Sequence, residues 1–118
     1  MGDSYRDLLV WKKAMELAKD IYRVTDSFPQ KEIYGLTSQI KKAAISVPCN
    51  VAEGKGRLGK GEFRQFLGIA RGSLMELETQ IILSCDFGYI EGTDANKLLA
   101  QSAEVGRMLN GLISKISA

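Results

Sequence analysis

Apolar residues recur at alternating steps of four and three along most of this chain, and this spacing constrains its fold more than any other feature. The first series contains Val10, Ala14, Leu17, Ile21, Val24 and Phe28. The last series contains Leu98, Ser102, Val105, Leu109, Leu112 and Ile116. Such steps place side chains on one face of an α-helix, whereas a half-buried strand needs strict alternation. The sequence therefore predicts amphipathic helices and no sheet.

Turn and capping residues divide the first half of the chain into two predicted helices. The first begins near Ser4 or Asp7 and ends at Phe28-Pro29, because the residue before a proline disfavours helical angles. The second begins near Tyr34 or Gly35 and ends around Glu53-Gly54, where the glycine is expected in the left-handed C-terminal position. Pro48 is expected to kink this helix, since its nitrogen cannot donate to the carbonyl of Ala44.

Two further helices are predicted in the second half. A glycine-rich connection over residues 55–61 leads to a third helix from Glu62 to Phe87. A turn over residues 88–92 then leads to a last helix capped by Thr93 or Asp94. Four amphipathic helices with short connections predict an all-α, antiparallel up-and-down four-helix bundle, formed as one domain by residues 1–118.

The third predicted helix is apolar on two sides. One stripe contains Phe63, Leu67, Ala70, Leu74, Leu77 and Ile81, and a neighbouring stripe contains Phe66, Ile69, Ser73, Gln80, Leu83 and Phe87. The second stripe is open to two interpretations: an interface between copies of the chain, or a central position of the helix within the monomer. Under the first interpretation the candidate interface residues are Phe66, Ile69, Ser73, Leu83 and Phe87.

Composition narrows the class of protein. With 45% hydrophobic and 25% charged residues, the chain suits a single globular domain. No apolar run approaches the roughly 20 residues that span a bilayer, and the first residues lack a basic-then-apolar leader, so we expect a cytoplasmic protein without membrane contact. Cys49 and Cys85 are too far apart for a CxxC motif and are expected to be buried free thiols.

Positive charge is concentrated in the middle of the chain. Residues 31–72 carry eight basic and three acidic side chains, whereas residues 73–118 carry three basic and six acidic ones. Phosphate groups of RNA or DNA are the partners that such a surface attracts. The alternative is a solvated face with local ion pairs to Glu53 or Glu62, and it is favoured by an expected lack of stacking aromatic residues among the cations. The candidate nucleic-acid-binding residues are Lys41, Lys42, Lys55, Arg57, Lys60, Arg64 and Arg71.

No catalytic, cofactor or metal site is predicted. The chain has no histidine, which removes the commonest general base and the Glu-x-x-His pairs of carboxylate metal bundles. The segment from Gly54 to Gly61 has the spacing of a phosphate-binding loop, but Gly61 replaces the required hydroxyl residue and no strand precedes it. An enzyme is therefore the least supported class.

Two long motifs resemble a known family. AAISVPCNVAEGKGR over residues 43–57 and FLGIARGSLMELETQI over residues 66–81 are similar to proteins encoded within intervening sequences of bacterial 23S ribosomal RNA genes. YGLTSQIKKAA over residues 34–44 also fits, and the similarity runs from Val10 to Ile113. The resemblance implies an antiparallel four-helix bundle that assembles as a homopentamer. It also extends to the accessory variability protein of diversity-generating retroelements, a pentameric barrel that engages nucleic acid and a reverse transcriptase.

Two function classes follow from these observations. One is a non-enzymatic oligomer that binds RNA or DNA through the basic group between residues 41 and 71. The other is a scaffold or accessory subunit for a protein partner, which would use the acidic C-terminal third or an exposed apolar groove and would make no contact with nucleic acid.

Overall fold

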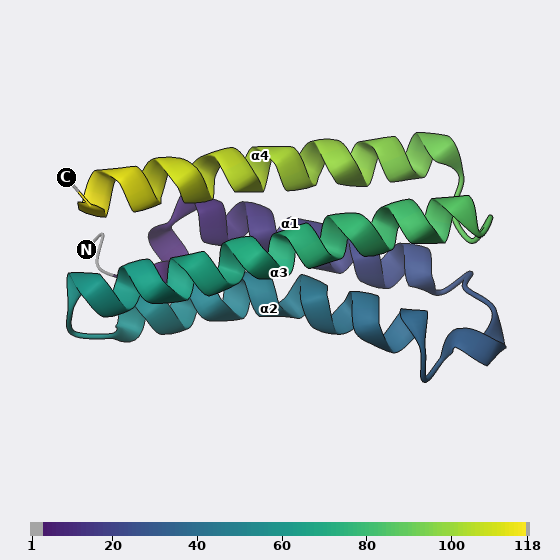
Figure 1. The fold of residues 1–118 in the computed structure, drawn as a ribbon, viewed down its shortest axis with the longest axis horizontal. Helices are drawn as coiled ribbons and strands as arrows, with labels where there is room; N and C mark the ends of the chain where they lie inside the picture. Colours follow the sequence, from purple (N-terminus) through teal and green to yellow (C-terminus); the bar gives the residue numbers. More distant parts are fainter. Residues whose placement is uncertain (1–3, 118) are drawn as a thin grey trace.

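The structure, a computed structural model, describes residues 4–117, and these form an antiparallel bundle of four long helices (Figure 1). The helices are α1 (Leu9–Thr25), α2 (Leu36–Gly56), α3 (Lys60–Asp86) and α4 (Gly92–Ser117). Two short 3-10 turns, η1 (Tyr5–Asp7) and η2 (Gln30–Glu32), precede α1 and α2. No strand occurs within these residues, so the predicted all-α bundle is confirmed. Helices adjacent in sequence pack together, and α4 closes the bundle against α1.

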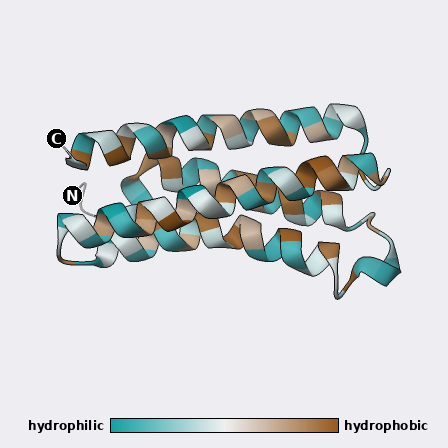
Figure 2. Ribbon diagram, viewed as in Figure 1, coloured by the Kyte–Doolittle hydropathy of each residue, from teal (hydrophilic) through white to brown (hydrophobic). Residues whose placement is uncertain are grey.

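The bundle core is built from the apolar stripes that define the helices. Along each ribbon, hydrophobic segments recur between hydrophilic ones, as expected for helices with one inward face (Figure 2). The largest fully buried side chains include Leu17, Ile21, Ile40, Leu67, Leu74, Leu77, Ile81 and Leu109. Burying each of these side chains contributes about 1.5–3 kcal/mol relative to leaving it exposed.

Helix α1 is shorter at both ends than predicted. Ser4 does act as a cap, but its Oγ accepts from the amide of Arg6 and begins η1, and α1 itself begins only at Leu9. The helix ends at Thr25, where the Thr25 hydroxyl donates to the carbonyl of Tyr22 at 2.9 Å. Phe28 is nevertheless buried, because the loop folds it back onto the core. An apolar side chain that continues a helical spacing therefore need not lie in the helix.

The corner between α2 and α3 differs most from the sequence prediction. Helix α2 continues to Gly56 and α3 begins at Lys60, so the connection is residues 57–59 rather than 55–61. Gly54 is not a left-handed cap; it is buried within α2, and a Cβ built on it would lie 2.7 Å from the Cβ of Phe66. Close helix approach explains the glycine. Within residues 4–117, a positive φ occurs only at Gly88, in the turn before α4.

The start of α4 was also predicted too late. The helix already includes Gly92, and the amide of Ala95 donates to the carbonyl of Glu91 at 2.9 Å. Thr93 and Asp94 therefore lie in the first helical turn rather than at a cap before it. Asp94 still places a negative charge near the positive helix end.

Polar side chains join α2 to α3 beside Pro48, which lies buried within α2. The side-chain amide of Asn50 donates to the carbonyl and the hydroxyl of Ser46, at 2.8 and 2.9 Å. The Ser46 hydroxyl lies 2.7 Å from that of Ser73 on α3. These bonds pair the part-buried side chains of Ser46, Asn50 and Ser73 with one another or with the backbone. The kink at Pro48 stays a prediction.

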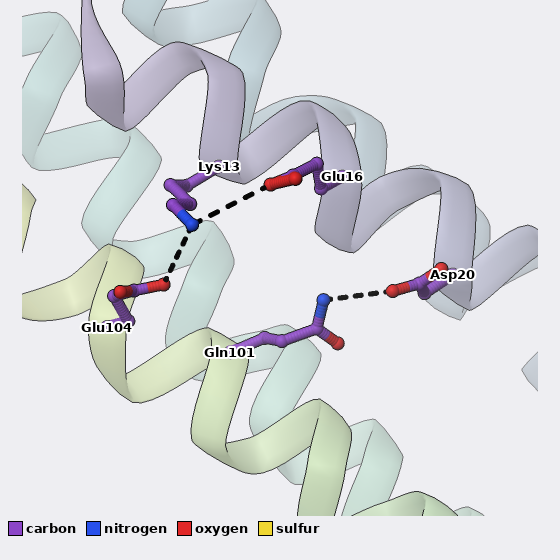
Figure 3. Close-up of polar contacts among 5 residues, drawn as sticks. All are labelled: Lys13, Glu16, Asp20, Gln101 and Glu104. Atoms are coloured by element: carbon purple, nitrogen blue, oxygen red, sulfur yellow. Dashed lines mark hydrogen bonds and ion pairs between the residues drawn. The ribbon is translucent and has the colours of Figure 1, made fainter.

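Partly exposed polar side chains connect α1 to α4 (Figure 3). The Lys13 ammonium lies 3.9 Å from Glu16 of its own helix and 3.8 Å from Glu104 of α4. Gln101 of α4 donates to Asp20 of α1 at 2.9 Å. Solvent-accessible pairs of this kind each contribute about 0–1 kcal/mol, so they align these two helices more than they stabilise them.

The two cysteines are not both buried. Cys85 is partly buried, but Cys49 is exposed on α2, which contradicts the prediction for that residue. Cys49 lies four residues after Ile45, which is also exposed. The apolar pattern of α2 thus includes residues on an outer face as well as the core residues.

A hydrogen-bonded clamp joins the two connections at the far end of the bundle. One Glu32 oxygen accepts from the amide of Leu36 at 3.1 Å, and the other accepts from the Tyr89 hydroxyl at 2.8 Å. The Tyr89 ring also packs against that of Phe28. Both bonds favour the charged carboxylate, so the pKa of Glu32 is lowered, first by the Leu36 amide and then by Tyr89. The same contact raises the pKa of Tyr89.

We expect this clamp to make stability depend on pH at both extremes. Because the pKa of Glu32 is lowered on folding, its contribution is present above the unfolded pKa and is lost as pH falls through the folded value. Because the pKa of Tyr89 is raised, its contribution is present below the unfolded pKa and is lost as pH rises through the folded value. Urea unfolding across pH, for the wild type and Glu32→Gln, measures the acid limb. The stability difference between them should shrink below about pH 4; a constant difference would contradict the assignment.

Candidate nucleic-acid interface

The two ends of the bundle carry opposite net charge. Antiparallel packing brings the start of α1, the α2–α3 corner and the end of α4 together at the end marked by both termini (Figure 1). We call this the basic end; its segments 4–12, 53–64 and 112–117 contain seven basic and three acidic side chains. The opposite, acidic end contains segments 20–35 and 84–97, with three basic and six acidic side chains. The cations of the basic end are Arg6, Lys12, Lys55, Arg57, Lys60, Arg64 and Lys115.

At the α2–α3 corner, two of the cations lie over aromatic rings. The Arg57 guanidinium is 4.9 Å from the ring centre of Phe66, and the Lys55 ammonium is 5.8 Å from that of Phe63. Aromatic residues thus accompany two of the cations of the corner. Their rings are half-buried beneath the charged groups, so they orient the cations rather than offer a stacking surface for bases.

One cation of the corner, Arg57, forms local ion pairs, as the alternative interpretation of the basic group expects. Arg57 lies 2.8 Å from Glu53 and 3.8 Å from Glu62. Lys55 and Lys60 have no ion-pair partner among residues 4–117, and Lys60 is exposed. The corner therefore keeps ammonium groups that are not neutralised within the monomer.

Arg64 and Arg71 share a face of α3, as their spacing predicts, and that face is directed at α4. Arg64 donates to the Ser117 hydroxyl at 2.8 Å, and Arg71 donates to the side-chain oxygen of Asn110 at 2.9 Å. Arg64 belongs to the basic end, whereas Arg71 lies about 10 Å further along the helix. Both arginines are exposed, and the side chains to which they donate are neutral, so these bonds form no ion pair.

Lys41 and Lys42 lie away from the other candidates. The Lys41 ammonium is 4.9 Å from the ring centre of Tyr22, on the side of α2 that faces α1. Fourteen residues of helix, about 21 Å, separate Lys41 from Lys55. The seven candidates therefore do not form one surface: four lie at the basic end, Arg71 lies along the α3–α4 contact, and the two lysines lie beside α1.

Three cations of the basic end were missed by the sequence argument. Arg6, Lys12 and Lys115 lie near the ends of the chain, and the antiparallel topology brings them to the same end as the α2–α3 corner. The predicted topology is sufficient to place these three cations together, because an even number of antiparallel helices returns both termini to one end of the bundle. A count of charges along the sequence does not show this grouping, because the three residues are far from the α2–α3 corner in the sequence.

The second stripe of α3 divides into two parts. Phe66 is covered by Arg57, Ser73 is bonded to Ser46, and Gln80 is buried, so these residues serve packing within the monomer. Ile69, Leu83 and Phe87 remain 46%, 40% and 58% exposed. Monomer packing does not account for this exposed part.

Two glutamates of α2 and α3 are bonded to other side chains. Glu53 pairs with Arg57, and Glu78 accepts a 2.6 Å hydrogen bond from the buried Ser102 hydroxyl. Within the part of the chain that the structure describes, no three His, Cys, Asp or Glu side chains are grouped so that they could hold a metal ion. None of the helices in these residues has the length and hydropathy needed to cross a membrane.

Fold and charge together define a small all-helical bundle protein with one strongly basic end. The chain belongs to the family of 23S rRNA-intervening sequence proteins, whose family model matches residues 6–111. The fold is similar to the crystal structure of a protein of unknown function from the S23 ribosomal protein family of Bacteroides thetaiotaomicron. That likeness has a TM-score of 0.83 at 21% sequence identity and covers 90% of this chain and 96% of the other. No curated protein matches the sequence.

Proposed function

We propose that this protein is a non-enzymatic cytoplasmic bundle that assembles with copies of itself and binds the phosphate backbone of RNA or DNA through its basic end. The observation that carries the proposal is the excess of seven basic over three acidic side chains at that end, opposite an acidic end. A charge distribution of this kind attracts and orients a polyanion. It is more informative than the net charge of +2, in which the two ends largely cancel.

Self-assembly supports this role by repetition. In a closed cyclic oligomer every basic end lies at the same height along the symmetry axis, so the fields of the copies add. We propose a homopentamer, following the family resemblance, with the exposed part of the second α3 stripe in the interface. The 46–58% exposure of Ile69 and Phe87 is the supporting observation for that surface.

Salt-dependent titration of fluorescent RNA tests the proposal. We expect the affinity of a single-stranded 20-mer and of a hairpin to fall linearly with salt on a log–log plot. Changing Lys55, Arg57 and Lys60 together to Ala should reduce the slope by about 2, since each neutralised phosphate contributes about 0.7 on single strands. Fluorescence anisotropy between about 50 and 200 mM salt measures both quantities.

The matched control changes Lys31, Lys97 and Arg107, three exposed cations outside the basic end, together to Ala. It removes the same formal charge and should lower the slope much less than the corner variant does. Equal losses in the two triple variants would show binding without a defined surface and would overturn the assignment. Absence of wild-type binding at low salt would overturn nucleic-acid binding altogether.

A protein scaffold is the second candidate function, and the acidic end favours it. Tyr34 is 95% exposed and Ile33 is 48% exposed, beside the six acidic side chains of that end. Exposed aromatic and apolar groups are typical anchors of protein interfaces. The same titration separates the two functions, because Tyr34→Ala leaves RNA binding unchanged if only the basic end contacts nucleic acid.

A further inference from the structure

A largely apolar groove runs between α1 and α2 on the outside of the bundle. It has a volume of about 570 Å³, and its lining includes Met15, Ala18, Tyr22, Ile45, Pro48 and Cys49. Tyr22 and Ile45 are each 40% exposed. The groove is therefore an apolar surface without a partner in the monomer.

The rim of this groove is mainly positive. Lys19 and Arg23 line it directly, and Lys41 and Lys42 line its continuation beside Tyr22 and Ile45. Arg23 is paired with Asp20 of its own helix, but the three lysines have no ion-pair partner among the described residues. A segment that fits this groove would combine apolar side chains with carboxylates.

The outer face of α3 has that composition. Ile69, Glu76, Leu83 and Phe87 follow steps of seven, seven and four, so they share one face, and all four are exposed. Asp86 adds a second exposed carboxylate next to Phe87. The cations of α3 nearest to this segment, Arg64 and Arg71, are instead bonded to α4. The face is thus apolar and acidic.

Two glycines leave the backbone of this face open. A Cβ built on Gly68 or Gly72 would meet no atom within 4 Å, so monomer packing does not require either glycine. Glycine within a helix costs about 1 kcal/mol relative to alanine. Gly72 lies between Ile69 and Glu76 on the outer face, where a missing side chain lets another helix approach closely.

We infer that the outer face of α3 in one copy docks into the α1–α2 groove of the next copy. This rests on the proposed self-assembly and specifies its geometry. Pairing α3 with α3 of another copy would bring carboxylates together without a cation, whereas the groove supplies lysines that match Glu76 and Asp86. Helices α1 and α3 lie diagonally across the bundle, since in the described residues each packs on α2 and α4 but not on the other. One copy can therefore engage two neighbours, as a head-to-tail ring requires.

Complementary single variants test this geometry. Ile45→Glu places an acid in the groove, and Leu83→Lys places a cation on the α3 face, so each variant alone should be monomeric. The Ile45→Glu chain keeps an intact α3 face, and the Leu83→Lys chain keeps an intact groove. Mixed in equal amounts, they should form a 1:1 dimer of twice the 13.0 kDa chain mass and nothing larger. Light scattering after gel filtration measures these masses.

Three outcomes would overturn the inference. An Ile45→Glu variant that assembles like the wild type would show that the groove is not used, and a mixture that stays monomeric would show that the two surfaces are not partners. A monomeric wild type would overturn the proposed self-assembly itself, which separates that failure from failure of the docking geometry. Leu58→Glu and Ser114→Lys, at exposed positions outside both surfaces, are matched charge controls and should leave the wild-type mass unchanged. Far-ultraviolet circular dichroism confirms that each variant is folded.

Discussion

Replacing Leu74 with alanine is expected to lower the free energy of unfolding by about 2–5 kcal/mol. Leu74 lies midway along α3 and is fully buried. Its Cδ2 atom would be 3.4 Å from a Cβ built on Gly106 of α4, so the leucine fills the space above that glycine. Truncation leaves a cavity between two helix backbones, which cannot collapse into it without losing their other contacts.

Chemical denaturation at one fixed protein concentration measures this effect, because assembly adds a concentration-dependent contribution to stability. Leu58→Ala is the matched control: Leu58 is fully exposed at the α2–α3 corner, and its truncation should change stability by less than about 0.5 kcal/mol. Adding Gly106→Ala to the Leu74 variant should recover part of the loss, since the new methyl group enters the cavity. Strict additivity of the two substitutions would contradict the predicted contact.

The core could be predicted from the sequence because its signal is repeated many times. A single error in the four-three spacing of α1 or α4 changes little when five or six residues determine the same face. Helix ends depend on single residues, and these are ambiguous. In the sequence, Gly54 fits a C-terminal helix cap as well as it fits a close contact between two helices. The position of Phe66 on the facing helix shows that the close contact is the reason for the glycine.

The sequence predicts only those parts of the candidate interface whose residues are close together in the chain. Lys55, Arg57 and Lys60 lie together because a three-residue connection keeps neighbours in sequence close in space. Lys41 and Lys42 lie apart from them, since a helix separates residues by about 1.5 Å for each step along its axis. Arg6 and Lys115 join the basic end only through the antiparallel packing of the chain termini. Charge at the two ends of a bundle is thus a property of topology, which a count along the sequence does not reveal.

Gly54→Ala is expected to destabilise the bundle by about 1–3 kcal/mol, the usual range for overpacking a core. The added Cβ would lie 2.7 Å from the Cβ of Phe66 and 3.3 Å from the carbonyl oxygen of Phe63, so α2 and α3 must move apart. Gly111→Ala is the matched control. Gly111 lies within α4, a Cβ there would meet nothing within 4 Å, and helix propensity should stabilise this variant by about 1 kcal/mol.

The contact atom on Phe66 gives this prediction a further test. Because the closest contact is with Cβ, Phe66→Ala removes the ring but leaves the clashing atom in place. The double variant Gly54→Ala with Phe66→Ala should therefore show no rescue, and urea unfolding of the two single variants and the double variant measures it. A stabilising Gly54→Ala, equal to Gly111→Ala, would mean that the α2–α3 spacing tolerates a methyl group. Opposite signs at the two glycines would show that helix approach, rather than chain termination, requires glycine at position 54.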